Sequence, residues 1–277
     1  MKNKIIIIIL TGGFAALSIY LFVNAPPPLP DPINETKPAY SVKEAFNMLA
    51  KENDLTRRLY TLCIVGEGKK QGLQFDENWQ DDNIEAGPLP ALFLRETSNS
   101  IEKRGIGLGL YLGSDFPISK ANKFSGIQDE RFQEIKKDGQ PRFFFDERVQ
   151  RYTAMFPDYA SVNTCVSCHN DHEQSPKKDW KLNDVMGATT WTYPKDSLTS
   201  DELIQAIKTY KEGVKTTYAL YITKMRNVKK DKAPVIGTHW PSKGLYIPDT
   251  EVFIDSLTTL TASGFVNNLT RRNAVNQ

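Results

Sequence analysis

The chain has 277 residues, of which 40% are hydrophobic and 25% are charged, and its formal net charge is +2. This is the composition of a globular protein that can bury a core, and the small net charge gives no reason to expect nucleic acid as a partner. Once the N-terminal segment is set aside, the length allows one large domain, or one medium domain with an extension.

The first 24 residues predict a membrane anchor. Residues 1–4 form a short basic segment, and the nineteen residues from Ile5 to Val23 are largely apolar. At the rise of an α-helix they span about 28 Å, close to the hydrocarbon core of a bilayer. The lysines before this segment predict a cytoplasmic N-terminus and an extracytoplasmic, periplasmic location for the rest. Because Pro26 obstructs a cleavage site at Ala25, a single-pass anchor in the cytoplasmic membrane is favoured over a removed signal peptide.

A proline-rich segment, residues 25–39, predicts a stiff spacer between this anchor and the folded part. The predicted domain, residues 40–198, opens with a helix, because Ser41 and Glu44 form a capping-box pattern. Apolar residues then recur at helical spacing until Gly66, where we expect the helix to end.

A polar loop over residues 76–90 leads into a second predicted helix, residues 89–103. The strict alternation in residues 106–113 then predicts a strand. One face of that strand consists almost only of glycine, which permits the close approach of a flat ligand. A closely packed helix or a bulge explains the same glycines, and we favour this packing interpretation.

The second half of the domain predicts one further helix and several strands. A capping-box pattern at residues 125–128 begins the helix, which we expect to end near Gly139. Strands are predicted at residues 142–145, 152–156 and 185–193. Helices mixed with strands over short connections indicate an α+β fold on an antiparallel sheet.

The remainder, residues 199–277, predicts a partly helical C-terminal extension. Thr199 and Glu202 form another capping-box pattern, and an amphipathic helix follows to about Arg226.

The run Cys165-Val166-Ser167-Cys168-His169 carries the chemistry of the chain. C-x-x-C-H is the attachment sequence of a c-type haem. The thiols of Cys165 and Cys168 form thioethers to the two vinyl groups, and His169 becomes the proximal ligand of the iron. We therefore predict one covalent haem c, which agrees with the export signal because haem c is attached outside the cytoplasmic membrane.

A zinc site and a thiol redox pair are the two alternatives to haem. Together with His172, the two cysteines of the motif could bind zinc, but a structural zinc site usually needs a second ligand pair, which the sequence lacks. A thiol redox pair needs C-x-x-C at the start of a helix in a βαβ setting. Residues 157–164 instead predict a loop that leaves a strand.

The order of these segments resembles a family of exported single-haem c-type domains with a PAS-like fold, catalogued largely as a domain of unknown function. The resemblance covers about residues 40–194 and implies redox sensing or electron transfer. Only Cys165, Cys168 and His169 match that family position by position. The segments that carry the resemblance are AGPLPALFLRETSNSI, GIGLGLYLGSDFPI, PRFFFDE, RYTAMFPDYA, CVSCH and DVMGATTWTYP.

The sixth iron ligand is the main open question of the sequence. The resemblance implies that a distal cysteine thiolate is available, and Cys63 is the remaining cysteine; otherwise it is a buried free thiol. His239, Met155 and Met186 are further candidates, and an open site that binds a small gas is another. His172 lies too close to the proximal histidine to reach the opposite face of the haem.

These observations favour extracytoplasmic electron transfer. The alternative is a haem-based redox or gas sensor that signals through a separate partner protein, because residues 1–4 are too few for a cytoplasmic output. No convincing set of acid–base groups indicates an enzyme. An acidic redox or signalling partner could be steered by the lysines at positions 177, 178, 224, 229, 230 and 232.

Overall fold

The structure, a computed structural model, describes residues 13–15, 17, 20, 39–229 and 233–261. Two compact units divide the chain, Met1–Pro38 and Ala39–Gln277, and the second contains the fold. The predicted anchor, residues 1–24, and the spacer, residues 25–39, lie almost wholly outside the described residues. Within the described ranges, no helix is both long and apolar enough to cross a membrane.

A four-stranded antiparallel sheet forms the centre of the fold, with the strand order β4-β7-β6-β5. Ala154 of β6 lies opposite Trp191 of β7 in this sheet. The sheet and its flanking helices confirm the predicted α+β class. The strands are β4 (Gly109–Gly113), β5 (Arg142–Asp146), β6 (Arg151–Tyr159) and β7 (Val185–Tyr193).

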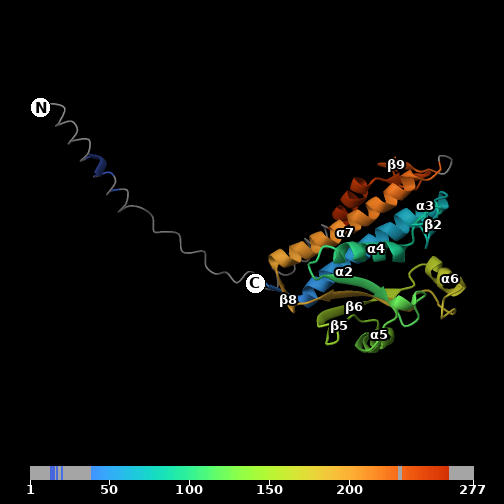
Figure 1. The fold of residues 1–277 in the computed structure, drawn as a ribbon, viewed down its shortest axis with the longest axis horizontal. Helices are drawn as coiled ribbons and strands as arrows, with labels where there is room; N and C mark the ends of the chain where they lie inside the picture. Colours follow the sequence, from blue (N-terminus) through green and yellow to red (C-terminus); the bar gives the residue numbers. More distant parts are fainter. Residues whose placement is uncertain (1–12, 16, 18–19, 21–38, 230–232, 262–277) are drawn as a thin grey trace, which may run out of the picture. The chain divides into compact units, whose positions relative to one another are not determined.

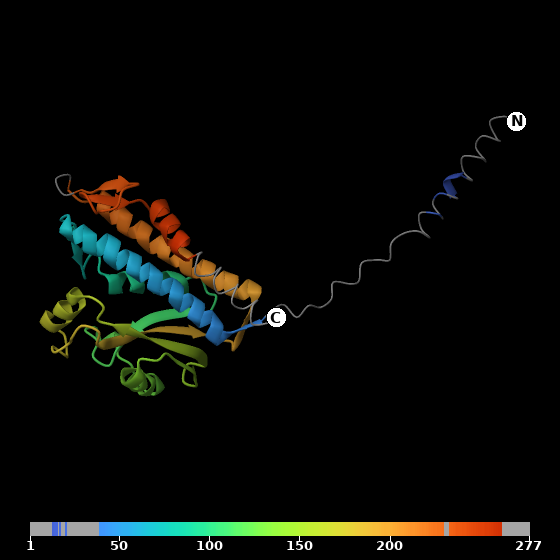
Figure 2. The same ribbon diagram turned by 180° about the vertical axis from the view of Figure 1, so that it is seen from behind.

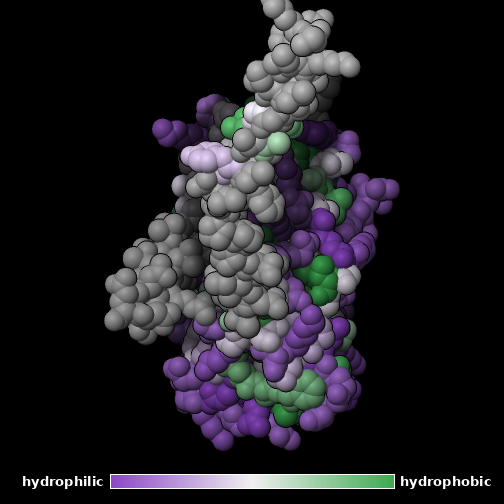
Figure 3. Space-filling model, turned by 90° about the vertical axis from the view of Figure 1, so that its left-hand side faces the viewer, coloured by the Kyte–Doolittle hydropathy of each residue, from purple (hydrophilic) through white to green (hydrophobic). Residues whose placement is uncertain are grey.

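Helices cover both faces of the sheet (Figures 1 and 2). On one face lie α2 (Val42–Leu59), α4 (Pro90–Glu102) and α7 (Ser200–Arg226), and on the other lies α5 (Ile127–Asp138). Most of the apolar core lies on the first of these faces. Figure 3 shows that the side turned to the viewer there is mostly hydrophilic, with scattered hydrophobic patches.

The helix α7 is a central part of this core, although the sequence predicts that it belongs to an extension at residues 199–277. Its tyrosines Tyr210, Tyr218 and Tyr221 are completely buried. Residues 250–261 form a further helix, which places Phe253 and Leu257 in the same core. The first part of the predicted extension therefore shares one hydrophobic core with the preceding domain.

Short elements complete the described fold. Three two-stranded pairs lie outside the central sheet, and a 3-10 turn precedes α5. They are β1 (Ala39–Ser41) with β8 (Ser197–Thr199), β2 (Phe75–Asp76) with β3 (Gly87–Pro88), β9 (Val235–Gly237) with β10 (Tyr246–Pro248), and η2 (Lys120–Asn122). The predicted loop at residues 76–90 thus carries a small strand pair at its ends.

The capping box at the start of α2 is confirmed. The Glu44 amide donates to Ser41 Oγ at 3.2 Å, and the Ser41 amide donates to the Glu44 carboxylate at 2.9 Å. The predicted end at Gly66 is wrong, because the helix continues through a π-helix, η1 (Tyr60–Gly66), into α3 (Glu67–Lys70). Burial of neighbouring side chains in η1 outweighs the low helix propensity of glycine.

The predicted capping box at residues 125–128 is wrong. Gly126, with a φ of 58°, occupies the N-cap position and makes no side-chain cap. The Gln128 side chain instead donates to Asp146 at 3.1 Å and accepts from the Tyr111 hydroxyl at 2.6 Å. The predicted end of α5 at Gly139 is confirmed by the left-handed conformation of that residue.

The predicted strand at residues 106–113 begins later, at Gly109. Gly107, with a φ of 78°, is in a left-handed conformation that interrupts the extended chain. A Cβ atom on Gly109 would lie 2.3 Å from Thr192 Oγ1, and one on Gly113 would lie 2.3 Å from the Phe124 ring. Side chains of the protein itself therefore fill the space beside these glycines, which supports packing over a flat ligand.

The buried tyrosines of the core differ in their hydrogen bonds. The Tyr60 hydroxyl donates to the Pro88 carbonyl at 2.7 Å, and the Tyr218 hydroxyl donates to the Pro248 carbonyl at 2.9 Å. The Tyr221 hydroxyl is buried and has no hydrogen-bond partner among the described residues. A buried polar group without a partner opposes folding, so these hydroxyls have opposite effects on stability.

We expect Tyr60→Phe and Tyr218→Phe each to lower the free energy of unfolding by about 1–2 kcal/mol, because each leaves a buried carbonyl without its donor. Tyr221→Phe is expected to leave that free energy unchanged or to raise it slightly. Urea unfolding of the purified chain measures all three. If Tyr221→Phe lowered the free energy of unfolding as much as Tyr60→Phe, Tyr221 would have to have a hydrogen-bond partner.

Candidate functional site

The C-x-x-C-H motif lies on a short helix, α6 (Asn163–Asp171). The strand β6 continues to Tyr159, where it pairs with Val185 of β7. The loop predicted for residues 157–164 is therefore wrong, since only residues 160–162 separate the strand from the helix. The helix lies at the same end of the fold as α3 and β2 (Figures 1 and 2).

The three side chains of the motif lie close together on this helix. Positions i, i+3 and i+4 are neighbours on an α-helix, which groups Cys165, Cys168 and His169 on one side. Cys165 is half-buried and packs, with Val166, against a small apolar cluster of Ala160, Trp180 and Met186. Cys168 is exposed, and neither cysteine forms a disulfide.

The surroundings of His169 favour the neutral form of its imidazole. Burial and the neighbouring His172 lower the pKa of His169, whereas the charge of Asp158 acts in the opposite direction. Its Nδ1 atom is enclosed and has no hydrogen-bond partner among the described residues. A neutral imidazole is the form that binds a metal ion.

Two polar contacts fix the end of α6. The Asn170 side chain donates to the Trp180 carbonyl at 3.0 Å and accepts from the Trp180 amide at 2.8 Å. This double contact ties the helix to the loop that follows it. His172 lies 3.3 Å from the Glu77 carboxylate through Nε2, and its Nδ1 accepts from the Gln174 amide at 3.1 Å. Both ring nitrogens of His172 therefore have partners within the protein.

An ion pair that the sequence did not suggest lies beside the motif. Arg57 of α2 donates to both carboxylate oxygens of Asp158 on β6, at 2.7 and 3.2 Å, and to Thr189 Oγ1 at 3.2 Å. The two charged side chains are 23% and 22% exposed. They are 101 residues apart in sequence, so no local pattern connects them.

Cys63 lies in the π-helix η1 and is half-buried. Burial, followed by the charge of Glu67, raises the pKa of its thiol. The same continuous helix leads to Lys69, whose charge favours the thiolate of Cys168. Cys63 thus lies on the helical segment that ends near the motif.

The other proposed iron ligands lie in different surroundings. Met155 is buried with Phe132 under α5, whereas Met186 belongs to the apolar cluster against which Cys165 packs. The His239 ring lies 5.3 Å from that of Tyr246, next to β9. This strand is on the far side of α7 from the sheet (Figures 1 and 2). Of these three residues, Met186 is the one whose cluster borders the motif.

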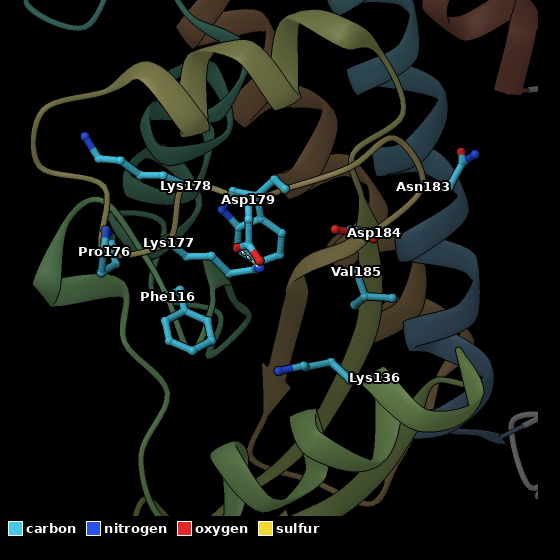
Figure 4. A pocket seen from close by; sticks show the side chains of 10 residues that line it. Phe116, Lys136, Pro176, Lys177, Lys178, Asp179, Asn183, Asp184 and Val185 are labelled. Carbon is cyan, nitrogen blue, oxygen red and sulfur yellow. Dashed lines mark hydrogen bonds and ion pairs between the residues drawn. The ribbon is translucent and has the colours of Figure 1, made fainter.

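A groove of about 920 Å³ opens beside the apolar cluster under α6. In Figure 4 the side chains of Phe116, Lys136 and Lys177 point into this space. The Lys177 ammonium lies 4.6 Å from the centre of the Trp180 ring and pairs with Asp179. The lining residues are Phe116, Lys136, Pro176, Lys177, Lys178, Asp179, Trp180, Asn183, Asp184 and Val185.

The remaining lysines of the predicted docking surface are partly used within the fold. Lys224 donates to the Asp81 carbonyl at 2.5 Å, and the Lys229 ammonium lies 3.8 Å from Glu85. Lys230 and Lys232 lie outside the described residues. Lys177 and Lys178 are therefore the two of this group that line the groove.

The structure also bears on the two alternatives to haem. Among the described residues, no three histidine, cysteine or carboxylate side chains are grouped as ligands of a metal ion. Cys165 does lie at the start of a helix, as a thiol redox pair requires, but β6 and β7 are antiparallel neighbours. Desolvation raises the pKa of Cys168, although Lys69 opposes it, whereas a reactive thiol needs a lowered pKa.

Comparison with known proteins places the chain in a family. A family model described as Tll0287-like matches residues 33–194. No curated protein matches the chain, and no solved structure does. The matched region covers more than half of the chain and includes α6 with the whole central sheet. The chain therefore belongs to the Tll0287-like family.

Proposed function

We propose that this protein carries one covalent haem c and transfers electrons outside the cytoplasmic membrane. The observation that carries the proposal is the grouping of two free thiols and one half-buried imidazole on one side of α6. Cys165 and Cys168 would form the two thioethers, and His169 would bind the iron. When bound, the haem supplies a one-electron iron couple.

The surroundings of the motif fit such a group. Because the Nδ1 atom of His169 is enclosed, the imidazole would bind the iron through its other nitrogen. Val166, Trp180 and Met186 offer apolar contacts next to Cys165. Burial of a haem edge against apolar side chains is one of the means by which a protein sets its reduction potential.

Electron transfer is favoured by the exposure of the motif. Cys168 lies at the surface, so a haem attached there would keep an edge accessible to a partner protein. Lys136, Lys177 and Lys178 line the adjacent groove, and such cations suit an acidic docking surface. We propose no enzymatic reaction.

The PAS-like character of the domain belongs to this proposal. The antiparallel sheet with helices on both faces supports it at the level of architecture. A redox or gas sensor built on the same architecture is the alternative function, and it requires an iron site that a gas can reach.

For the sixth ligand we propose Cys63. Its support is its place on the helical segment that reaches Lys69, near Cys168, and its lack of a disulfide. A bound iron would deprotonate the thiol despite the raised pKa of the free group. Residues 1–24 are proposed to anchor the domain, on the basis of their basic and apolar sequence.

The covalent attachment is tested in chain produced together with a c-type maturation system. We expect mass spectrometry to show one haem on the wild-type chain and none on the double variant Cys165→Ser, Cys168→Ser, because the thioether sulfurs are gone. Cys63→Ser is the matched control and should retain the covalent haem. A wild-type chain that leaves such cells without haem would overturn the proposed function.

The iron ligation is tested by optical and EPR spectra of the haem-loaded chain. We expect a six-coordinate, low-spin haem that CO does not alter. Cys63→Ser should change the ferric spectrum, while Met186→Leu, a control of similar volume next to the motif, should not. A spectrum unchanged in Cys63→Ser would exclude Cys63 as a ligand, and rapid CO binding to the wild-type chain would favour the sensor.

A further inference from the structure

We propose that Arg57 and Asp158 act together as an electrostatic control of the redox site at His169. In this arrangement Asp158 favours the oxidised iron, and Arg57 cancels most of that effect. The inference deepens the proposed function and rests on it. It assigns a role to two residues that lie outside the C-x-x-C-H motif.

The geometry of the pair is the first support. Arg57 Nη1 and Nη2 each donate to a different carboxylate oxygen of Asp158, at 2.7 and 3.2 Å. A bidentate contact of this kind fixes both the distance and the orientation of the two charges. Thr189 Oγ1 accepts a further hydrogen bond from the guanidinium at 3.2 Å, which holds Arg57 against the sheet.

The location of the pair is the second support. Asp158 lies near the end of β6, and only residues 160–162 separate that strand from α6. Asp158 is close enough to the His169 ring for the two to interact electrostatically. A negative charge near a bound iron would stabilise the more positive oxidation state of that iron.

Partial burial strengthens the effect. About three-quarters of each side chain is removed from solvent, so water and salt screen the two charges less than surface charges. The Arg57 Nε atom is enclosed without a partner among the described residues. The other charged group that acts on both members of the pair is Asp54, from the same helix as Arg57.

Other groups near the motif also carry charge. His172 acts on the same ring as Asp158, and its Nε2 lies against Glu77. Lys69 and Glu77 act in opposite directions on Cys168. Because these charges are unchanged when Arg57 or Asp158 is replaced, the two replacements isolate the contribution of the pair.

The experiment measures the midpoint potential of the haem-loaded full chain by spectroelectrochemical titration at one pH. Asp158→Asn should raise the potential, because the Arg57 charge is then uncompensated. Arg57→Met should lower it, because the Asp158 charge is uncompensated. We expect each to change the reduction equilibrium constant by about tenfold or more, which is 59 mV for a one-electron couple.

Two controls separate this effect from a general change of charge or structure. Arg57→Lys keeps the charge and should restore a potential close to the wild-type value. Glu251→Gln removes a carboxylate from another ion pair, 2.8 Å from Lys215, and should leave the potential unchanged. If Arg57→Met does not accumulate as folded protein, the test is the midpoint potential of Asp158→Asn, a replacement that keeps the side-chain shape. A rise in that potential supports the inference.

Each result gives a clear answer. Opposite shifts in Asp158→Asn and Arg57→Met support the inference, since a structural disturbance alone has no reason to reverse its sign. Covalent haem with an unshifted potential in Asp158→Asn, or shifts of the same sign in both variants, would overturn the inference and leave the proposed function standing. A wild-type chain without covalent haem would overturn both.

Discussion

The antiparallel pairing of β6 with β7 is the constraint on which the candidate site depends. The two strands are hydrogen-bonded from Tyr152 opposite Tyr193 to Tyr159 opposite Val185. The chain between them, residues 160–184, must therefore leave and re-enter the sheet at the same end. It is closed at its base by two hydrogen bonds, from the Ala160 amide to the Asp184 carbonyl and from the Asn183 amide to the Ala160 carbonyl, each 2.9 Å long. This connecting segment carries α6 and holds the motif at the end of the sheet.

Contacts from other parts of the chain then give the motif its surroundings. Asn170 ties α6 to its own loop, while Glu77, just after β2, reaches His172. Arg57 connects α2 to the strand that leads into α6. The site is therefore composite: its reactive groups come from one short helix, but charges that act on them come from β6, α3 and the segment after β2.

Local sequence patterns predicted the elements whose stabilising contacts are themselves local. The capping boxes at Ser41 and Thr199 and the left-handed end of α5 at Gly139 each depend on residues within about one turn of helix. The failures arose where a distant residue competed. Gln128 bonds to Tyr111 and Asp146 instead of capping its own helix. The same reason explains why the sequence predicts the motif, whose three ligand-type residues lie within five consecutive positions, but not the Arg57–Asp158 pair, whose members are 101 residues apart.

The π-helix η1 sets the rotational phase between the two ends of one long helical run. Because an α-helix advances about 100° per residue, one residue more or fewer within Tyr60–Gly66 would turn α3 by roughly that angle relative to α2. The present phase keeps Lys69 of α3 where its charge acts on Cys168 of α6. We therefore expect the length of this segment to matter more for the site than its composition. Single-residue insertions and deletions there would separate Lys69 from α6, while most substitutions would not.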